Sequence, residues 1–420
     1  MTSPKPAGEA PAGRLVARTV EVADPGPLLD LLPDDSPTAW LRRGEGIVGW
    51  GVAARCRTSG PDRFTEAGDW WRAVSAHAVV RDEVGVPGTG LVAMGSFAFA
   101  DEPGDSVLVV PRVVVGRRGH AAWVTLVGED ELTPVPPLEP ADEPESPGGV
   151  VFTDGGISGA EWEGVVAQAV RRINAGELEK VVLARDLVAT TDEPVDVRWP
   201  LRRLAERYEM CWTFHVDAMF GATPEMLVRR ERGLVTSRVL AGTIRRTGDD
   251  AHDLALAATL ARSSKDLEEH EYAVRSVAEA LLPYCSSMNV PEAPFVLHLP
   301  NVMHLATDVA GVVHDAQGAT VLELAAALHP SAAVGGTPTK VAVEMIAEIE
   351  GMDRGRYAGP VGWMDASGDG EFGIALRSAE VRGNEVRLFA GCGIVADSDP
   401  GAELAEAQAK FVPVRDALAD

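Results

Sequence analysis

Cysteine is scarce in the 420-residue sequence, and the few copies form no motif. Cys56, Cys211, Cys285 and Cys392 stand far apart, and no CxxC pair is present. The spacing therefore indicates neither a zinc site nor a disulfide framework. Cysteine usage of this kind is typical of a reducing compartment, so we expect a cytoplasmic protein.

Long apolar runs and an excess of positive charge are also missing. No stretch reaches about 18 consecutive apolar residues, so we expect no membrane-spanning helix. The net charge is −25, which argues against nucleic acid or an anionic membrane surface as a partner. No Walker A loop occurs, and GTGLVAMG (88–95) lacks the GxGxxG spacing, so nucleotide binding is not supported.

Composition divides the chain into a leader and two parts. Residues 1–14 are rich in Pro, Ala and Gly and predict a disordered leader. Residues 15–149 carry short apolar runs that predict strands of an antiparallel sheet, followed by a Pro- and acid-rich linker or surface loop at 131–149. Helices and strands mix over 150–420, so we expect an α+β fold in which both parts form one integrated domain.

Hydrophobic periodicity predicts the individual elements. Strands are expected in the first part at 46–56, 90–99, 106–116 and 121–128, and in the second part at 180–189, 211–217, 225–240 (as a hairpin), 361–366, 371–381 and 385–395. Helices are expected at 161–176, 198–208, 250–262, 264–283, 319–328, 338–350 and 400–411.

The C-terminal segment SDPGAELAEAQAK (398–410) carries the first candidate site. Glu403, Glu406 and Lys410 follow at i, i+3 and i+7, so they share one helix face. Two carboxylates one turn apart are a plausible ligand pair for a hard divalent cation. The alternative is a solvated charged face with a weak Glu–Lys pair.

A second acidic cluster opens the helix expected at 264–283. Asp266, Glu269 and His270 lie along one side of it, and Glu269 could supply a further metal oxygen. The alternative is that these acids complement the helix dipole.

Three further charged residues stand at strand ends or inside strands. Lys180 opens an apolar strand, where partial desolvation would make it a usable base, although such lysines also extend to water. Glu225 follows a turn and could act as an acid or be an ordinary strand-end charge. Arg377 lies within 371–381, where it could clamp a carboxylate.

Glycine-rich pieces accompany these residues. LAGTI (240–244), HPSAAVGGTP (329–338) and FAGCGIV (389–395) each bound an apolar run. Their backbone N–H groups could approach an anion closely, and the alternative for each is a tight turn.

Taken in order, the segments over about 150–418 resemble the chorismate-utilising enzymes, which include isochorismate synthases, salicylate synthases and the first components of anthranilate and aminodeoxychorismate synthases. The segments are EKVVLAR, FGATPEMLVRR, LAGTIRR, SSKDLEEH, MHLATDVAG, LHPSAAVGGTP, RYAGPVGW, GEFGIALRSAE, FAGCGIV and SDPGAELAEAQAK. The resemblance implies a large two-layer, anthranilate synthase component I-like fold, with antiparallel sheets flanked by helices.

The resemblance also assigns a metal site. It implies that Glu269 and Glu403 bind a catalytic Mg²⁺, that Glu406 lies close to the same ion, and that Asp266 supports the ligands. The ion would hold the ring carboxylate of chorismate, a dianion that needs local positive charge in an acidic protein.

The substrate carboxylates would meet five further positions. The resemblance implies that Tyr357 and Arg377 hold the enolpyruvyl carboxylate and that Lys410 lies near a carboxylate. Backbone amides around Gly391 and Gly393 would complete the cradle.

The reacting atoms would lie between an acid and a base. By resemblance, Lys180 is the neutral base that activates water at C2, and Glu225 is the protonated acid for the departing C4 hydroxyl. Gly242 and Thr243 match the segment beside that hydroxyl, and His304 matches the active-site histidine. We expect burial to raise the pKa of Glu225.

Two positions indicate the member of the family. Amine-transferring members tend to lack the lysine at position 180, so water is the expected nucleophile and no glutaminase partner is expected. Ala333 resembles isochorismate synthases, whereas salicylate synthases tend to have Thr. We expect a monomeric isochorismate synthase that serves menaquinone or siderophore synthesis; the alternatives are a salicylate synthase and a non-catalytic chorismate-binding relative.

Overall fold

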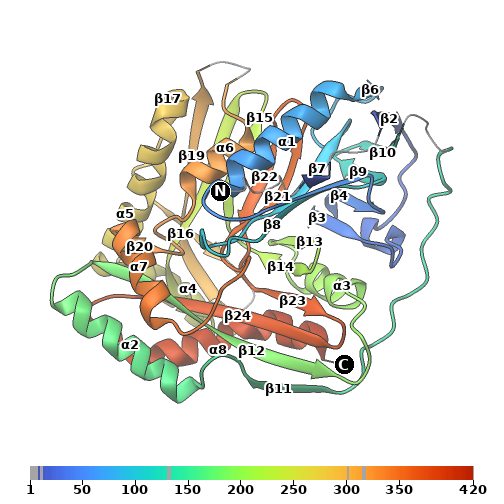
Figure 1. Cartoon of the computed structure of the whole chain (residues 1–420). Coiled ribbons are helices and arrows are strands. Elements are labelled where there is room, and N and C mark those ends of the chain that lie inside the picture. The colour runs from blue at the N-terminus through green and yellow to red at the C-terminus, as the bar shows by residue number, and fades with distance from the viewer. Residues whose placement is uncertain (1–7, 10–12, 130–133, 300–301, 315–317, 420) are drawn as a thin grey trace, which may run out of the picture.

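Two large β-sheets and the helices that flank them make up this computed structural model (Figure 1). The structure describes residues 8–9, 13–129, 134–299, 302–314 and 318–419, without the side chains of Glu9, Lys265 and Glu269. The predicted leader lies largely outside these residues. Among the described strands every pairing is antiparallel except that of β2 with β6.

The first sheet contains, in spatial order, β1 (Gly8–Glu9), β5 (Ala54–Thr58), β8 (Ser106–Val110), β7 (Val92–Ser96), β21 (Pro360–Asp365), β22 (Gly370–Ile374), β15 (Met226–Glu231), β16 (Leu234–Arg245), β19 (Val302–Val313) and β17 (Cys285–Asn289). A further strand, β18 (Phe295–His298), also pairs with β19.

The second sheet contains, in the same manner, β11 (Val150–Asp154), β12 (Lys180–Thr191), β24 (Glu385–Ile394), β23 (Ser378–Arg382), β14 (Met219–Thr223), β13 (Trp212–Val216), β3 (Thr38–Arg42), β4 (Glu45–Trp50), β9 (Val113–Arg118), β10 (Ala121–Glu129), β2 (Leu15–Glu21) and β6 (Val79–Asp82). The short strand β20 (Gly336–Thr337) pairs with β12.

The α-helices are α1 (Arg63–His77), α2 (Gly159–Asn174), α3 (Arg198–Arg207), α4 (Asp250–Leu260), α5 (Ser264–Leu281), α6 (Val321–Leu328), α7 (Thr339–Ile349) and α8 (Pro400–Leu418), with 3-10 turns η1 (Leu28–Leu31) and η2 (Leu282–Tyr284). In the part of the chain that the structure describes, no helix combines the length and apolar character needed to cross a bilayer.

Local sequence explains where the main helices begin. The hydroxyl of Ser158 accepts the Glu161 N–H, and the Glu161 carboxylate accepts the Ser158 N–H, which is a capping box at the start of α2. Asp399 accepts the Ala402 N–H at 2.9 Å at the start of α8. Both starts satisfy N–H groups that have no partner within the helix.

The N-terminal runs do not form the single antiparallel sheet that we expected. The run 46–56 divides into β4 of the second sheet and β5 of the first, because Gly51 turns the chain with φ +64°. The run 106–116 divides in the same way into β8 and β9 around Pro111. Alternation identifies a buried strand but does not say which sheet it joins, so the expectation was wrong here.

One helix of the N-terminal part was missed. In α1 the buried positions Ala67, Trp71 and Val74 lie on one face, but Gly68 and the paired tryptophans weaken its helical propensity. The strands that were missed are β1, β2, β3, β6, β11, β14, β17, β18, β19 and β20.

The segment 371–381 is not one strand. It divides into β22 of the first sheet and β23 of the second, and Arg377 lies between them with φ +50°. The interior strand position that we expected for Arg377 was therefore wrong, because the chain crosses between the sheets at this residue.

Strands from both halves of the sequence meet in both sheets. β7 pairs with β21 in the first sheet, and β3 pairs with β13 in the second. The largest core cluster includes Trp40 of β3, Phe214 of β13 and Phe372 of β22, and the Trp40 and Phe214 rings lie 6.3 Å apart. The extended segment 134–149 runs along one side of the molecule to β11 (Figure 1).

Candidate active site

A cavity of about 290 Å³ is lined by residues of both sheets and of α8. Its lining includes these positions singled out from the sequence: Lys180, Glu225, Gly242, Thr243, Asp266, His304, Ala333, Tyr357, Arg377, Gly391, Gly393, Glu403, Glu406 and Lys410. Residues more than 200 positions apart in the chain thus meet around one small-molecule-sized space.

Glu225 lies between β14 and β15 and is 5% exposed. Burial raises the pKa of its carboxyl to about 8, although Lys180, Lys410 and Arg377 oppose this shift. At neutral pH the side chain therefore carries a proton that it can donate. The raised pKa expected from the sequence agrees with this environment.

Lys180 is the first residue of β12 and is 9% exposed. β12 pairs with β24 on one side, and Lys180 itself lies opposite Thr337 of β20 on the other. The lysine is therefore held between two strands at the edge of the cavity. Glu225, in the link between β14 of the second sheet and β15 of the first, lines the same space.

A bulge shapes the wall formed by β16 and β19. The strand register shifts between Ala241 and Thr243, and the extra residue, Gly242, has φ +76°. A Cβ atom at Gly242 would lie 3.2 Å from the Asp266 side chain of α5. Glycine is therefore required both by the backbone conformation and by the close approach of α5.

His304 lies opposite Thr243 on β19, and its Nδ1 lies 3.0 Å from the Thr243 hydroxyl. Burial, with Arg377 and Lys410, lowers the pKa of His304 to about 3, so the ring is neutral. Its Nε2 is buried and has no hydrogen-bond partner among the described residues. A neutral imidazole with one open nitrogen can bond a polar ligand group.

Arg377 and Tyr357 supply groups for an anion. Arg377 is 9% exposed and has no carboxylate partner among the described residues. The Tyr357 ring stacks on Phe389 with centroids 5.1 Å apart, and burial raises the pKa of its hydroxyl to about 12. A mostly buried guanidinium without a carboxylate partner among the described residues, in the same cavity as a neutral phenol donor, suits a carboxylate.

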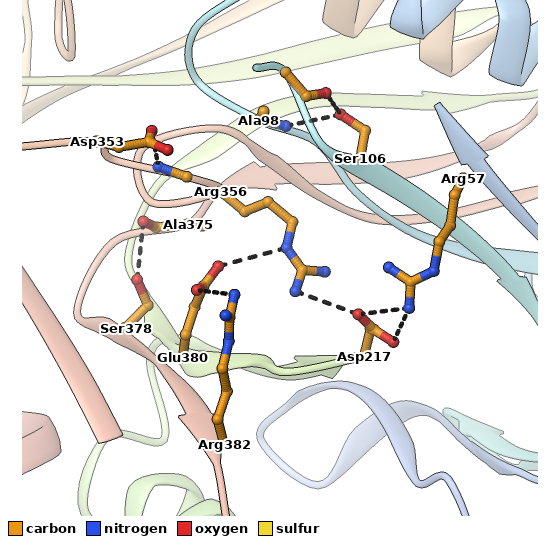
Figure 2. A network of polar contacts seen from close by, with 12 residues as sticks. Arg57, Ala98, Ser106, Asp217, Asp353, Arg356, Ala375, Ser378, Glu380 and Arg382 are labelled. Atoms are coloured by element: carbon orange, nitrogen blue, oxygen red, sulfur yellow. Dashed lines mark hydrogen bonds and ion pairs between the residues drawn. The ribbon is translucent and has the colours of Figure 1, made fainter. Parts of the chain in front are cut away.

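A polar network braces the loops that carry these two residues (Figure 2). Arg356, next to Tyr357, lies 3.4 Å from Asp217 and 3.6 Å from Glu380. Glu380 follows Arg377 by three residues on β23. The network therefore ties both loops to the hairpin between β13 and β14.

The wall formed by α8 and β24 brings two carboxylates close to a thiol. Side-chain ligand atoms of Glu403, Glu406 and Cys392 lie within 4.8 Å of one another. Glu403 accepts the Ser398 hydroxyl at 2.7 Å, and Glu406 pairs with Lys410 at 2.7 Å. Burial raises the pKa of Cys392, so its thiol remains protonated and donates to the Glu403 carbonyl.

The donor set suits a hard cation. Burial opposes ionisation of Glu406, but Lys410 lowers its pKa on balance and keeps it ionised. Burial also opposes the charge on Lys410, but the carboxylate of Glu406 raises its pKa on balance. Two carboxylates without a thiolate fit Mg²⁺ better than a soft metal. The side chain of the third predicted ligand, Glu269 of α5, lies outside the described residues.

Lys410 also donates to the carbonyl of Gly391 at 2.8 Å. A Cβ atom at Gly391 would lie 2.9 Å from the Leu183 carbonyl and 3.2 Å from the Tyr357 hydroxyl. Glycine at this position therefore allows β24 to approach both Leu183 and the Tyr357 hydroxyl. Gly393, two residues further along β24, also lines the cavity.

Sequence reasoning missed several lining residues, among them Val182, Arg354, Phe389 and Ser398. Arg354 lies two residues before the segment RYAGPVGW. Its pairing with Glu350, four residues earlier, is local, but its contacts with the carbonyls of Val182 and Val334 join it to other parts of the chain.

Comparisons with known proteins agree with one another. A family model described as "Chorismate binding enzyme" matches residues 138–419. The isochorismate synthase DhbC of Bacillus subtilis (strain 168) is 42% identical over 262 residues, which are 60% of this chain and 66% of the relative, just under two thirds of its length.

Two further matches span nearly the whole chain. The salicylate biosynthesis isochorismate synthase of Pseudomonas aeruginosa is 34% identical over 407 residues, covering 90% of this chain and 84% of the relative. The solved structure of MenF, the menaquinone-specific isochorismate synthase from Escherichia coli, has a TM-score of 0.80 at 26% identity and covers 99% of this chain and 96% of that one. The fold class expected from the sequence is confirmed.

Proposed function

Since the chain belongs to the chorismate-binding enzyme family, we propose that it is an isochorismate synthase, which converts chorismate to isochorismate. The observation that carries the proposal is the pairing of Lys180 with a protonated Glu225 across one cavity. An acid and a base on either side of a bound ring can remove one hydroxyl while another is added.

The reaction adds water at C2 as the C4 hydroxyl leaves. Lys180 accepts a proton from the attacking water while the C2–O bond forms. The ring double bonds shift, the C4–O bond breaks, and Glu225 gives its proton to the departing hydroxyl, which leaves as water. The net change is the transfer of a hydroxyl from C4 to C2, and the proton returns from Lys180 to Glu225 before the next turnover.

The remaining residues bind and orient the dianion. Arg377 and Tyr357 hold the enolpyruvyl carboxylate. Lys410 and the amides near Gly391 and Gly393 also act on the substrate, where the ammonium charge and the N–H dipoles favour an anion despite the net negative charge of the protein.

The C4 hydroxyl faces the wall formed by β16 and β19. Gly242 and Thr243 contact it, and the free Nε2 of His304 accepts or donates a hydrogen bond there. Because the His304 ring is neutral, this nitrogen can be either a donor or an acceptor, depending on the tautomer.

Mg²⁺ is the proposed cofactor. Glu403 and Glu406 would hold it together with Glu269, with Asp266 in support, and when bound it would supply positive charge for the ring carboxylate. We expect no glutaminase subunit, because Lys180 selects water over ammonia, and we propose a monomer that serves menaquinone or siderophore synthesis.

A salicylate synthase is the second candidate, because it would use the same acid and base before eliminating pyruvate. Ala333 favours the isochorismate synthase, since its methyl group lines the cavity where the salicylate synthases tend to carry Thr.

Product analysis tests the proposal. Purified protein is incubated with chorismate, with MgCl₂ or EDTA, and with or without ammonium, and the products are separated by liquid chromatography. Isochorismate that depends on Mg²⁺ and not on ammonium is the expected result. Salicylate with pyruvate would establish the second candidate, an amino product would overturn the role of Lys180, and no product would indicate a non-catalytic relative.

A further inference from the structure

A buried ion pair between Glu350 and Arg354 contacts two elements of the cavity wall, strand β12 and the loop that carries Ala333. Glu350, directly after α7, is 0% exposed, and Arg354 is 3% exposed. Arg354 donates from Nε to Oε1 of Glu350 at 2.6 Å and from Nη2 to Oε2 at 2.5 Å. The guanidinium also lies 4.2 Å above the Phe99 ring, which further restricts its position.

Both members of the pair also bond backbone atoms of β12. Oε2 of Glu350 accepts the Ala184 N–H at 2.8 Å, and Nη2 of Arg354 donates to the Val182 carbonyl at 2.7 Å. Lys180 opens this same strand, two residues before Val182. The pair thus fixes the strand that carries the proposed base.

Arg354 also bonds the loop that lies next to β12. Its Nη1 donates to the Val334 carbonyl at 2.9 Å, in the loop that also carries Ala333. The next residue, Gly335, accepts the Val182 N–H at 2.8 Å. One guanidinium therefore spans the strand of Lys180 and the loop of Ala333.

We propose that the Glu350–Arg354 pair is a positioning device that sets the separation of Lys180 from Ala333 and thereby holds chorismate for water addition rather than pyruvate elimination. The proposal rests on the proposed function. A buried ion pair is often replaceable by apolar residues without loss of stability. The planar guanidinium fork, by contrast, meets one carboxylate and two carbonyls at once, which a lysine cannot do. Misplacement of reacting groups by about 1 Å can lower a rate roughly a hundredfold.

The chain offers a matched control outside the cavity. Arg198, at the start of α3, is 7% exposed and bonds the Asp196 carboxylate at 2.9 Å. It also donates to the carbonyls of Leu32 and Asp142 at 3.0 and 3.1 Å. A substitution of this arginine removes the same kinds of contact away from the substrate.

The experiment compares Arg354→Lys with Arg198→Lys in the full chain. We expect both to lower Tm, but only Arg354→Lys to lower kcat, by roughly tenfold to a hundredfold, and to raise the ratio of salicylate and pyruvate to isochorismate. A similar kcat and product ratio in the two variants would show that the pair is merely structural. Glu350→Gln, which keeps the acceptor for Ala184, serves if Arg354→Lys does not fold.

A second measurement distinguishes failure of the proposed function from failure of the positioning proposal. If the unchanged protein makes no isochorismate, that function is wrong, and chorismate binding measured by calorimetry decides the positioning role. Weaker binding in Arg354→Lys than in Arg198→Lys would support it, and equal binding would overturn it.

Discussion

The protonation of Glu225 leads to a prediction that does not depend on the substrate. The pKa of Glu225 is about 8 in the folded protein, against an ordinary 4.5. The folded state therefore retains a proton that the unfolded chain releases, and this contribution to stability is complete below pH 4.5 and is lost as the pH rises through 8. At about 1.4 kcal/mol per pH unit, the wild-type protein loses about 2 kcal/mol between pH 6.5 and 8 through this group alone.

Glu225→Gln removes this dependence, since the amide has the shape of the protonated acid and does not titrate. We expect the difference in unfolding free energy between variant and wild type to change by about 2 kcal/mol in favour of the variant over that pH range. Urea denaturation at several pH values measures it. The exposed neighbour of the base offers a control, Glu179→Gln, which should follow the wild type.

The same titration should govern turnover. The wild-type kcat/KM should fall as the pH rises through about 8, because Glu225 loses the proton it donates. Glu225→Gln should have little activity and no such decline. Parallel stability curves for wild type and variant would refute the reasoning, because Glu225 would then be ionised at neutral pH.

Three further predictions concern other parts of the cavity. Lys180→Ala should lower kcat by at least roughly a hundredfold with little change in Tm; a fully active variant would exclude Lys180 as the base. Ala333→Thr should increase salicylate and pyruvate relative to isochorismate in chromatography, and an unchanged ratio would remove this position as a discriminator. Gly242→Ala should lower the unfolding free energy by about 1–2 kcal/mol, because φ is +76° and Asp266 is 3.2 Å from the added methyl; urea denaturation measures it, and an unchanged midpoint would contradict the argument.

The sequence made the α8 site predictable because helical geometry relates neighbouring residues. Glu403, Glu406 and Lys410 were expected on one face, and all three line the cavity. The cap of α8 was equally local, since Asp399 and its partner Ala402 are three residues apart. Such features depend only on residues that are a few positions apart in the sequence.

Features that depend on pairing between distant segments could not be predicted in this way. The division of 46–56 and 106–116 between two sheets reflects the partners of each strand. Arg354 has a local partner in Glu350, but its acceptors at Val182 and Val334, which connect it to the cavity walls, lie far from it in sequence. The roles of Lys180 and His304 came from the family resemblance, since neither residue is distinctive by its own spacing.

The mixing of early and late strands has a consequence for how the protein can be divided. The region similar to the family model begins at residue 138, but β21 and β13 would lose their neighbours β7 and β3 in a fragment that begins there. Each sheet would then end in a row of open N–H and C=O groups in what had been its interior, and such edges pair readily with other chains. We expect a fragment cut at this boundary to self-associate. A boundary of sequence similarity is here a poor guide to where an expression fragment should begin.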